Sequence, residues 1–312
     1  MRVLRTLDVR ERPVSSVVTI GNFDGVHLGH KRIIGRVKEL SKEIYGQAVL
    51  ITFDPHPVSV LRAEGVRIIT PLPLKMGLLE KEGIDLLLLL PFDETTRLME
   101  PEAFVKILVE RLCMRAIVVG SDFRFGRERR GDVSMLTQLA TNLGFRLVLV
   151  ENVEIEGERV GSQRIRQMLA EGEVRRARRF LGRPYEIYGR VVKGRKREIG
   201  FKTANIFTDF DIIPRDGVYI TELAVGSQRF ESVTNIGKNP TFGEDSLSIE
   251  THILDFSGDL YDREVGLFFL DRIRDEIAFE DVSSLKAQIE TDIEVARAYF
   301  RGLKDSLGLL YN

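Results

Sequence analysis

The first half of the chain alternates short apolar runs with segments in which apolar residues recur every three or four positions. The apolar runs predict strands at residues 14–20, 47–53, 84–91, 115–120 and 145–150. The periodic segments predict helices at residues 31–45, 74–81, 101–113 and 132–143. Near-continuous apolar strands that alternate with helices indicate a parallel sheet, Rossmann-like in its alternation and covered on both faces. Such sheets bind ligands beyond the carboxyl ends of their strands, at the turns after Ile20, Phe53 and Gly120.

The second half has a different pattern, which begins after Gly161. Two short helices are predicted at residues 162–169 and 174–181, and they end at Gly172 and Gly182. Short strands follow at residues 185–192, 217–225, 229–235, 248–256 and 264–270. Their regular spacing predicts a small antiparallel β-barrel, and the periodicity of residues 282–303 predicts an amphipathic C-terminal helix. We therefore expect two domains, residues 1–182 with the two short helices and residues 183–312 with the barrel.

Composition excludes several classes of protein. A chain of 312 residues that is 43% hydrophobic has enough apolar side chains for two folded cores, so wholesale disorder is excluded. The 46 Lys and Arg residues balance 47 Asp and Glu residues, whereas a protein whose main ligand is nucleic acid usually has a basic excess. The single cysteine, Cys113, excludes an internal disulfide. The charged N-terminus and the absence of a long apolar segment predict a cytoplasmic protein without a membrane span.

The first candidate site is the stretch from Gly21 to His30, between the first predicted strand and helix. Its glycines allow the backbone to approach a phosphate closely, and the start of a helix offers free N–H groups. His27 and His30 are three residues apart, so their imidazoles face the same side and can donate to phosphate oxygens. The alternative is an ordinary strand-to-helix turn with two surface histidines.

This stretch resembles the signature of the HxGH nucleotidylyltransferase superfamily. Its GxFDGxHxGH form is similar to that of the prokaryotic bifunctional riboflavin kinase/FAD synthetases. The resemblance implies nucleotide binding at Gly21, Phe23 and Gly29, and catalysis of adenylyl transfer by His27 and His30.

Three further segments of the first half resemble motifs of the same family. The turn Phe53–Pro57 implies flavin binding by Pro55, His56 and Pro57, although it also suits a rigid exposed turn. The loop Gly120–Gly126 implies flavin contacts from Asp122 and Phe125, whereas Phe123 and Phe125 also alternate as in a strand with one buried face. The segment Gly161–Arg166 takes the place of an S-S-T-x-I-R motif, in which Ser162 binds nucleotide and Arg166 acts on the ATP phosphates. Gly161 and Gln163 replace two of its hydroxyl residues.

The second candidate site lies in the barrel half, where Gly200–Ile206 resembles the riboflavin kinase motif G-F-P-T-A-N-I. Thr203 and Asn205 are two residues apart on an extended segment, so their oxygens point the same way and suit Mg²⁺ bound to nucleotide phosphates. Lys202 replaces the proline of the motif. The change removes a backbone constraint and adds a cation that could approach phosphate, and the sequence leaves open which effect dominates.

Glu250 matches the catalytic glutamate of the same family. A glutamate is ionised at neutral pH and can accept the proton of the ribityl hydroxyl as it attacks the γ-phosphorus of ATP. The alternative is a surface glutamate that pairs with a neighbouring strand. Arg274 matches a flavin-binding position of the family, while Asn239 and Asp262 depart from its usual residues. The basic loop 193–197 suits either a flap over the phosphates or a solvated face.

The resemblance covers residues 14–300 and implies two reactions that consume ATP. The barrel domain would phosphorylate riboflavin to FMN with Mg²⁺, and the first domain would transfer AMP to FMN to give FAD and pyrophosphate. The expected partners are these small molecules, with no membrane and no nucleic acid; homo-oligomer formation is left open. One alternative is a riboflavin kinase with a weakened or inactive adenylyltransferase domain. The other is a non-catalytic binding protein that responds to a flavin or a nucleotide and has an RNA or protein partner.

Overall fold

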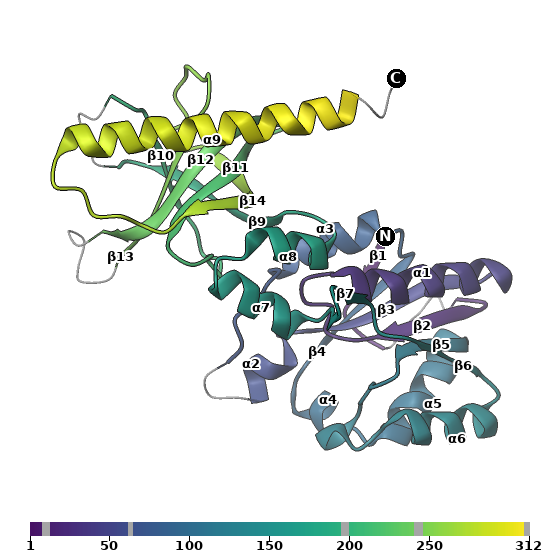
Figure 1. Ribbon diagram of the computed structural model, residues 1–312. Helices are drawn as coiled ribbons and strands as arrows, with labels where there is room; N and C mark the ends of the chain where they lie inside the picture. The colour runs from purple at the N-terminus through teal and green to yellow at the C-terminus, as the bar shows by residue number, and fades with distance from the viewer. Residues whose placement is uncertain (8–12, 62–64, 195–199, 240–245, 309–312) are drawn as a thin grey trace. The chain divides into compact units, whose positions relative to one another are not determined.

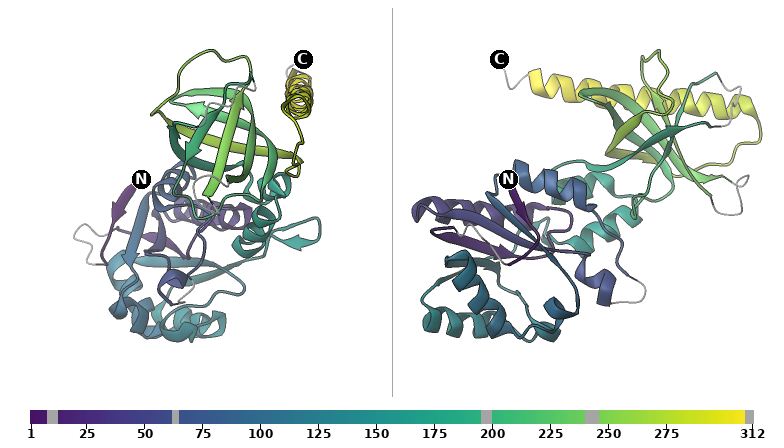
Figure 2. Two further views of the ribbon diagram at one scale, coloured as in Figure 1. Left: turned by 90° about the vertical axis from the view of Figure 1, so that its left-hand side faces the viewer. Right: turned by 180° about the vertical axis from the view of Figure 1, so that it is seen from behind.

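The computed structural model describes residues 1–7, 13–61, 65–194, 200–239 and 246–308. The chain packs as two units, Met1–Ser162 and Gln163–Asn312. Figures 1 and 2 show a sheet flanked by helices in the first unit and a barrel in the second. Both architectures confirm the fold class expected from the hydrophobic pattern.

The first unit is built on a six-stranded parallel sheet. Its strands are β1 (Arg2–Leu4), β2 (Ser16–Ile20), β3 (Gln47–Asp54), β4 (Leu86–Pro91), β5 (Met114–Gly120) and β6 (Arg146–Val150). They are arranged in the order β1-β4-β3-β2-β5-β6. β2 lies between β3 and β5; the chain passes from β2 to β3 and β4 on one side and only then crosses to β5 on the other, so the strand order reverses at β2. Parallel sheets bind ligands beyond the carboxyl ends of their strands at such a reversal. The sequence pattern did not predict β1, which has only three partly exposed residues.

Helices cover both faces of this sheet. The unit contains α1 (Leu28–Glu43), α2 (Pro57–Leu61), α3 (Leu72–Lys81), α4 (Glu94–Leu98), α5 (Pro101–Leu112) and α6 (Val133–Leu143), with a short 3₁₀ turn at Arg127–Arg129. Ile34 of α1 and Leu79 of α3 pack into the core on one face. Leu108 of α5 and Leu136 of α6 pack into the core on the other. A two-stranded ribbon, β7 (Glu154–Ile155) and β8 (Glu158–Arg159), follows the sheet.

The second unit contains a closed antiparallel barrel of six strands. Its elements are α7 (Ser162–Ala170, which begins at the last residue of the first unit), α8 (Val174–Leu181), β9 (Tyr185–Val192), β10 (Ala204–Phe207), β11 (Gly217–Val225), β12 (Gln228–Asn239), β13 (Ser246–Ile253), β14 (Glu264–Arg274) and α9 (Val282–Gly308). The strand order is β10-β13-β12-β11-β14-β9, and β10 pairs with β9 to close the barrel. Ala296 and Phe300 of α9 pack against the barrel wall.

The interior of the barrel is partly polar. Tyr185, Tyr219 and Phe269 fill one part of it as fully buried rings. Four buried hydroxyl residues form a hydrogen-bonded chain in which Thr251, Thr234, Thr221 and Ser232 follow one another at 2.9, 2.7 and 2.8 Å. Because Ser232 donates to the Thr221 carbonyl at 3.0 Å, every hydroxyl of this chain has a partner.

The two short helices α7 and α8, which follow the sheet in the sequence, belong to the second compact unit. α8 contacts β9 and β14, and the second compact unit begins at Gln163. Assignment of residues 163–182 to the first functional domain stays a prediction. Among the described residues, no helix is both long and apolar enough to span a membrane.

Candidate active sites

The turn that joins β2 to α1 has a strained backbone. Phe23 and Val26 have φ angles of 50° and 40°, and Gly25 between them has a φ of 89°. Positive φ is rare for residues other than glycine, above all for a β-branched valine, and persists only where surrounding structure holds it. Phe23 and Val26 are each 1% exposed and pack into the core beside α1, so the turn is anchored by burial.

His27 and His30 lie together at the start of α1. Their ring centroids are 3.6 Å apart, and the planes are inclined by only 15°. His27 caps the helix, because its Nδ1 accepts the backbone N–H of His30 at 3.3 Å. In the neutral form the proton of His27 therefore resides on Nε2.

His30 is held in its neutral form by its surroundings. Burial lowers its pKa well below the usual 6.5, and the neighbouring His27 and Lys75 lower it further because they disfavour another positive charge. Its buried Nδ1 has no hydrogen-bond partner among the residues that the structure describes. His30 can thus offer a neutral imidazole to an anionic ligand.

Buried groups that the sequence analysis missed hold this turn in place. The carbonyl of Asn22 accepts the Oγ1 hydroxyl of Thr52 at 3.1 Å and the ammonium of Lys75 at 3.2 Å. The carboxylate of Asp24 accepts the N–H groups of Ile69 and Thr70 at 3.2 and 3.0 Å. The available signal for Lys75 was its position four residues before the buried Leu79, on the apolar stripe of α3.

The predicted flavin turn follows β3 at the same edge of the sheet. Asp54 and Pro55 are joined by a cis peptide bond, and Pro57 is the first residue of α2. His56 Nδ1 accepts the N–H of Val58 at 3.2 Å, which fixes the start of that helix. Because β2 and β3 are neighbours, this turn and the turn after β2 lie at adjacent strand ends.

The loop after β5 contributes the third turn at this edge. Asp122 binds Arg159 of β8 at 2.6 Å. The rings of Phe123 and Phe125 stack at 5.4 Å. Phe125 is 6% exposed and belongs to the hydrophobic core, whereas Phe123 is only partly buried. Phe123 is therefore the ring of this pair that is available to a ligand.

Ser162 is hydrogen-bonded to the turn between β2 and α1. Its hydroxyl donates to the Asp24 carbonyl at 2.8 Å, so its oxygen keeps lone pairs but its proton is engaged. A Cβ at Gly29 would lie 3.2 Å from the His27 ring, which shows how closely the backbone approaches that imidazole. Arg166 lies on α7, in the second unit, and its action on ATP phosphates stays a prediction.

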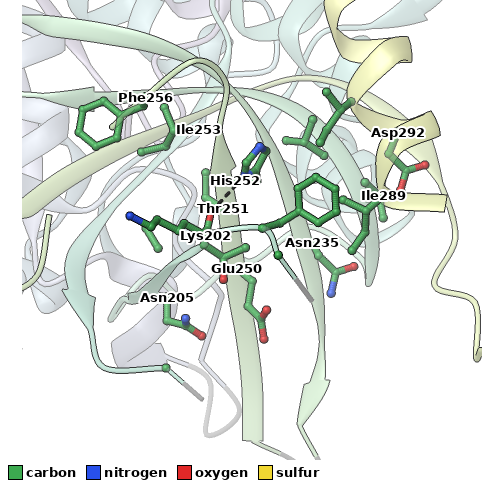
Figure 3. A pocket seen from close by; sticks show the side chains of 18 of the residues that line it. Lys202, Asn205, Asn235, Glu250, Thr251, His252, Ile253, Phe256, Ile289 and Asp292 are labelled. Atoms are coloured by element: carbon green, nitrogen blue, oxygen red, sulfur yellow. Dashed lines mark hydrogen bonds between the residues drawn. The ribbon is translucent and has the colours of Figure 1, made fainter. Parts of the chain in front are cut away.

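In the second unit, Glu250 lies between two asparagines on adjacent strands. The strand register pairs Glu250 of β13 with Asn205 of β10 on one side and with Asn235 of β12 on the other. Figure 3 shows the three side chains in this row. They line a cavity of about 1010 Å³, which Thr203 also lines. Ser248 donates to the Glu250 carboxylate at 3.2 Å.

His252 holds the segment that precedes Thr203. Its Nδ1 lies 2.9 Å from the Lys202 carbonyl, and its ring meets that of Phe201 edge-on at 5.5 Å (Figure 3 shows the hydrogen bond). A carbonyl can only accept, so Nδ1 carries the proton. The backbone of Gly194 lies against the Asn205 amide, because a Cβ at Gly194 would collide with it. Residues 195–197 of the basic loop lie outside the described residues.

Arg274 is held by an acid that the sequence analysis missed. Its Nε and Nη2 donate to the carboxylate of Asp292 on α9 at 3.0 and 2.7 Å, and Gln288 donates to the same carboxylate at 2.9 Å. The Asp292 side chain is only 4% exposed. Its position between Ile289 and Ile293, on the apolar face of α9, was the signal in the sequence. Arg274 also lies over the Phe279 ring at 5.9 Å.

Each half of the chain matches a model of a known protein family. A family model described as FAD synthetase matches residues 9–164, and one described as riboflavin kinase matches residues 181–300. Residues 165–180, which include most of α7 and α8, lie between the two matches. The two matches support the bifunctional expectation over the single-activity alternative.

Two bacterial relatives match this chain over almost their whole length. The bifunctional riboflavin kinase/FMN adenylyltransferase of Pseudomonas fluorescens is 37% identical over 303 residues, which cover 96% of this chain and 97% of the relative. The protein of the same name from Listeria monocytogenes is 35% identical and covers 94% and 95%. A crystal structure titled as a macrolide-efflux protein from Streptococcus pneumoniae superposes with a TM-score of 0.87 at 30% identity, covering 95% of this chain and 98% of that one. The chain belongs to the family of bifunctional riboflavin kinase/FMN adenylyltransferases.

Proposed function

We propose that the second unit phosphorylates riboflavin to FMN and that the first unit joins FMN to AMP, so that one chain makes FAD from riboflavin. ATP is consumed in each reaction, and riboflavin and FMN are the flavin substrates. The observation that carries this proposal is the presence of two separate sites in one chain. One is the stacked His27 and His30 at the edge of the parallel sheet, and the other is Glu250 between Asn205 and Asn235 at the barrel cavity.

In adenylyl transfer, a phosphate oxygen of FMN attacks the α-phosphorus of ATP. The new P–O bond forms as the bond to the bridging oxygen breaks, and pyrophosphate leaves with that electron pair. The nucleophile is already ionised, so no base is needed. The imidazoles of His27 and His30 donate hydrogen bonds to phosphate oxygens as negative charge develops there. Ser162 and Arg166 complete the proposed phosphate contacts, with Gly21, Phe23 and Gly29 around the nucleotide.

The flavin of this reaction is proposed to bind at the two neighbouring turns. Pro55, His56 and Pro57 follow β3, and the Asp122–Phe125 loop follows β5, so the two turns flank the end of β2. Phe123 offers a ring face to the flavin, and the buried Phe125 supports that ring from behind. The phosphate of a flavin bound here would reach the histidine pair between them.

In riboflavin phosphorylation, Glu250 is proposed to accept the proton of the primary ribityl hydroxyl. The hydroxyl oxygen then bonds to the γ-phosphorus of ATP while ADP leaves with the electrons of the broken P–O bond. Asn205 and Asn235 offer amide groups on both sides of the carboxylate. Arg274 is proposed to contact the flavin, and Asp292 fixes the direction of its guanidinium group.

The residues at the barrel site fit Mg²⁺ that arrives with the nucleotide. Thr203 and Asn205 offer neutral oxygens, which suit a hard cation. Among the described residues there is no group of three or more His, Cys, Asp or Glu side chains that could hold a metal ion. A cation here would therefore be bound mainly by the ATP phosphates, whose charge it would neutralise. Location in the cytoplasm and the oligomeric state stay predictions.

The test is a time course with the purified chain, riboflavin, excess ATP and Mg²⁺, with the flavins separated by chromatography. We expect FMN to rise first and then to give way to FAD. FMN alone, together with failure to convert added FMN, would favour a kinase whose first unit is inactive. Flavin binding without any product would favour the non-catalytic alternative.

A further inference from the structure

Lys75 carries a buried charge beside the turn between β2 and α1. The proposed chemistry gives this charge no role. It lies on α3 and is only 6% exposed. Lysine is almost never buried to this degree unless its ammonium has partners, because removing the charge from water is costly. A buried lysine at this position therefore needs an explanation.

The contacts of Lys75 connect α3 to the strained turn. Its ammonium donates to the Asn22 carbonyl at 3.2 Å, one residue before the positive φ of Phe23. Asp24 completes the connection in the opposite direction, because its carboxylate accepts two N–H groups from the segment just before α3. The helix and the turn are thus joined by one cationic and one anionic side chain that cross between them.

The charge of Lys75 also acts on the histidine pair. Burial lowers the pKa of Lys75, while the carboxylates of Asp24 and Asp54 oppose that change. The positive groups that act on His30 are His27 and Lys75, and both lower its pKa. Lys75 therefore contributes to keeping a proton off His30.

We propose that Lys75 is a positioning residue for adenylyl transfer, which fixes the Asn22 carbonyl and with it the strained turn that presents His27 and His30 to the phosphates. This inference rests on the proposed function of the first unit. Lys75 acts through the turn and through the field of its charge, and it does not itself touch the reacting atoms.

The experiment compares Lys75→Gln, which keeps a donor but removes the charge, with Lys75→Arg, which keeps both. Lys81→Gln is the matched control, because Lys81 is exposed on the same helix. Each full-length protein is assayed for conversion of FMN to FAD and of riboflavin to FMN, so that the kinase reaction reports the integrity of the chain. The chain has only four histidines, so side-chain NMR can follow the titration of His30 directly.

We expect Lys75→Gln to lower kcat for FAD formation about tenfold, since small displacements of a reactive geometry have effects of this size or larger. The titration midpoint of His30 should rise, because a like charge has been removed. Lys75→Arg should keep the midpoint and most of kcat, and Lys81→Gln should match the unmodified chain. All variants should keep the kinase rate.

Three results would overturn the inference. They are an unchanged kcat in Lys75→Gln, an unmoved His30 midpoint in that variant, and equal loss of FAD formation in Lys75→Gln and Lys75→Arg. The last would assign the effect to side-chain shape alone. If the unmodified chain itself failed to convert FMN, the proposed function would fail instead, and the two failures are therefore distinguishable.

Discussion

His27 and His30 show how geometry fixes the charge of a site at the scale of single residues. Two positive charges at their separation of 3.6 Å would repel each other by about 5 kcal/mol, if the effective dielectric constant is about 20. Double protonation is therefore unfavourable in the free protein. A bound triphosphate would reverse this balance, because its negative charge favours protonated imidazoles. The two imidazoles together therefore carry at most one positive charge before a ligand binds.

The depressed pKa of His30 predicts a pH dependence of stability. Below pH 6.5 the unfolded chain binds a proton at this residue while the folded chain does not, so the free energy of unfolding should fall as pH drops toward the lowered pKa. Above pH 6.5 this contribution is constant. Urea unfolding of the intact chain at several pH values would measure the slope, and His30→Asn should reduce it. Equal slopes in both proteins would contradict the assignment.

Glu250 predicts a separation of the two activities. Glu250→Ala should block formation of FMN, because no base remains beside the ribityl hydroxyl, whereas supplied FMN should still become FAD. The expected loss of the kinase rate is at least about a hundredfold. The reciprocal variant His30→Ala should accumulate FMN. Chromatography of the flavins measures both, and loss of both reactions in either variant would argue against two separate sites.

At the scale of elements, α9 and β14 are joined by the Arg274–Asp292 pair. Asp292→Ala should lower the free energy of unfolding of the second unit by about 3 kcal/mol, because it leaves a mostly buried guanidinium without its partner. The KM for riboflavin should rise as Arg274 loses its orientation. Glu290→Ala, an exposed acid on the same helix, is the control and should change neither quantity. A normal KM in Asp292→Ala would separate Arg274 from flavin binding.

The sequence pattern predicted the long, strongly periodic elements and missed the short ones. β10 has four residues and takes its place only because it pairs with β9 and β13, which no local pattern encodes. α1 begins at Leu28, three residues before its predicted start, because the His27 side chain caps it. The turns after β2, β3 and β5, which carry the family motifs, could be located from their residues alone. Lys75, Asp24, His252 and Asp292 were not, because each acts through a contact made only in the folded chain.

At the scale of the whole molecule, the product of one unit is the substrate of the other, and both reactions draw on ATP. The chain has a net charge of only -1, so its overall charge does not attract polyanions such as ATP. Binding of ATP must therefore come from local groups such as the histidine pair and the basic side chains near each site.

Removal of Mg²⁺ should affect catalysis without affecting the fold. Chelation with EDTA should stop FMN formation, and added Mg²⁺ should restore it. The thermal midpoint of the ligand-free chain should not change, because Thr203 and Asn205 supply too few ligands to hold a structural ion. Differential scanning calorimetry with and without chelator measures this, and a lower midpoint in EDTA would reveal a metal site built by the protein itself.

Closure of the barrel by β10 has a consequence for its motions. β10 is the shortest barrel strand, and it carries Asn205 at the point where the barrel is sealed. Strands with few backbone hydrogen bonds separate most easily, so the amide protons of β10 should exchange with solvent faster than those of β11 or β12. A nucleotide held at Asn205 would then restrain the pairing of β10 with β9 and slow this exchange.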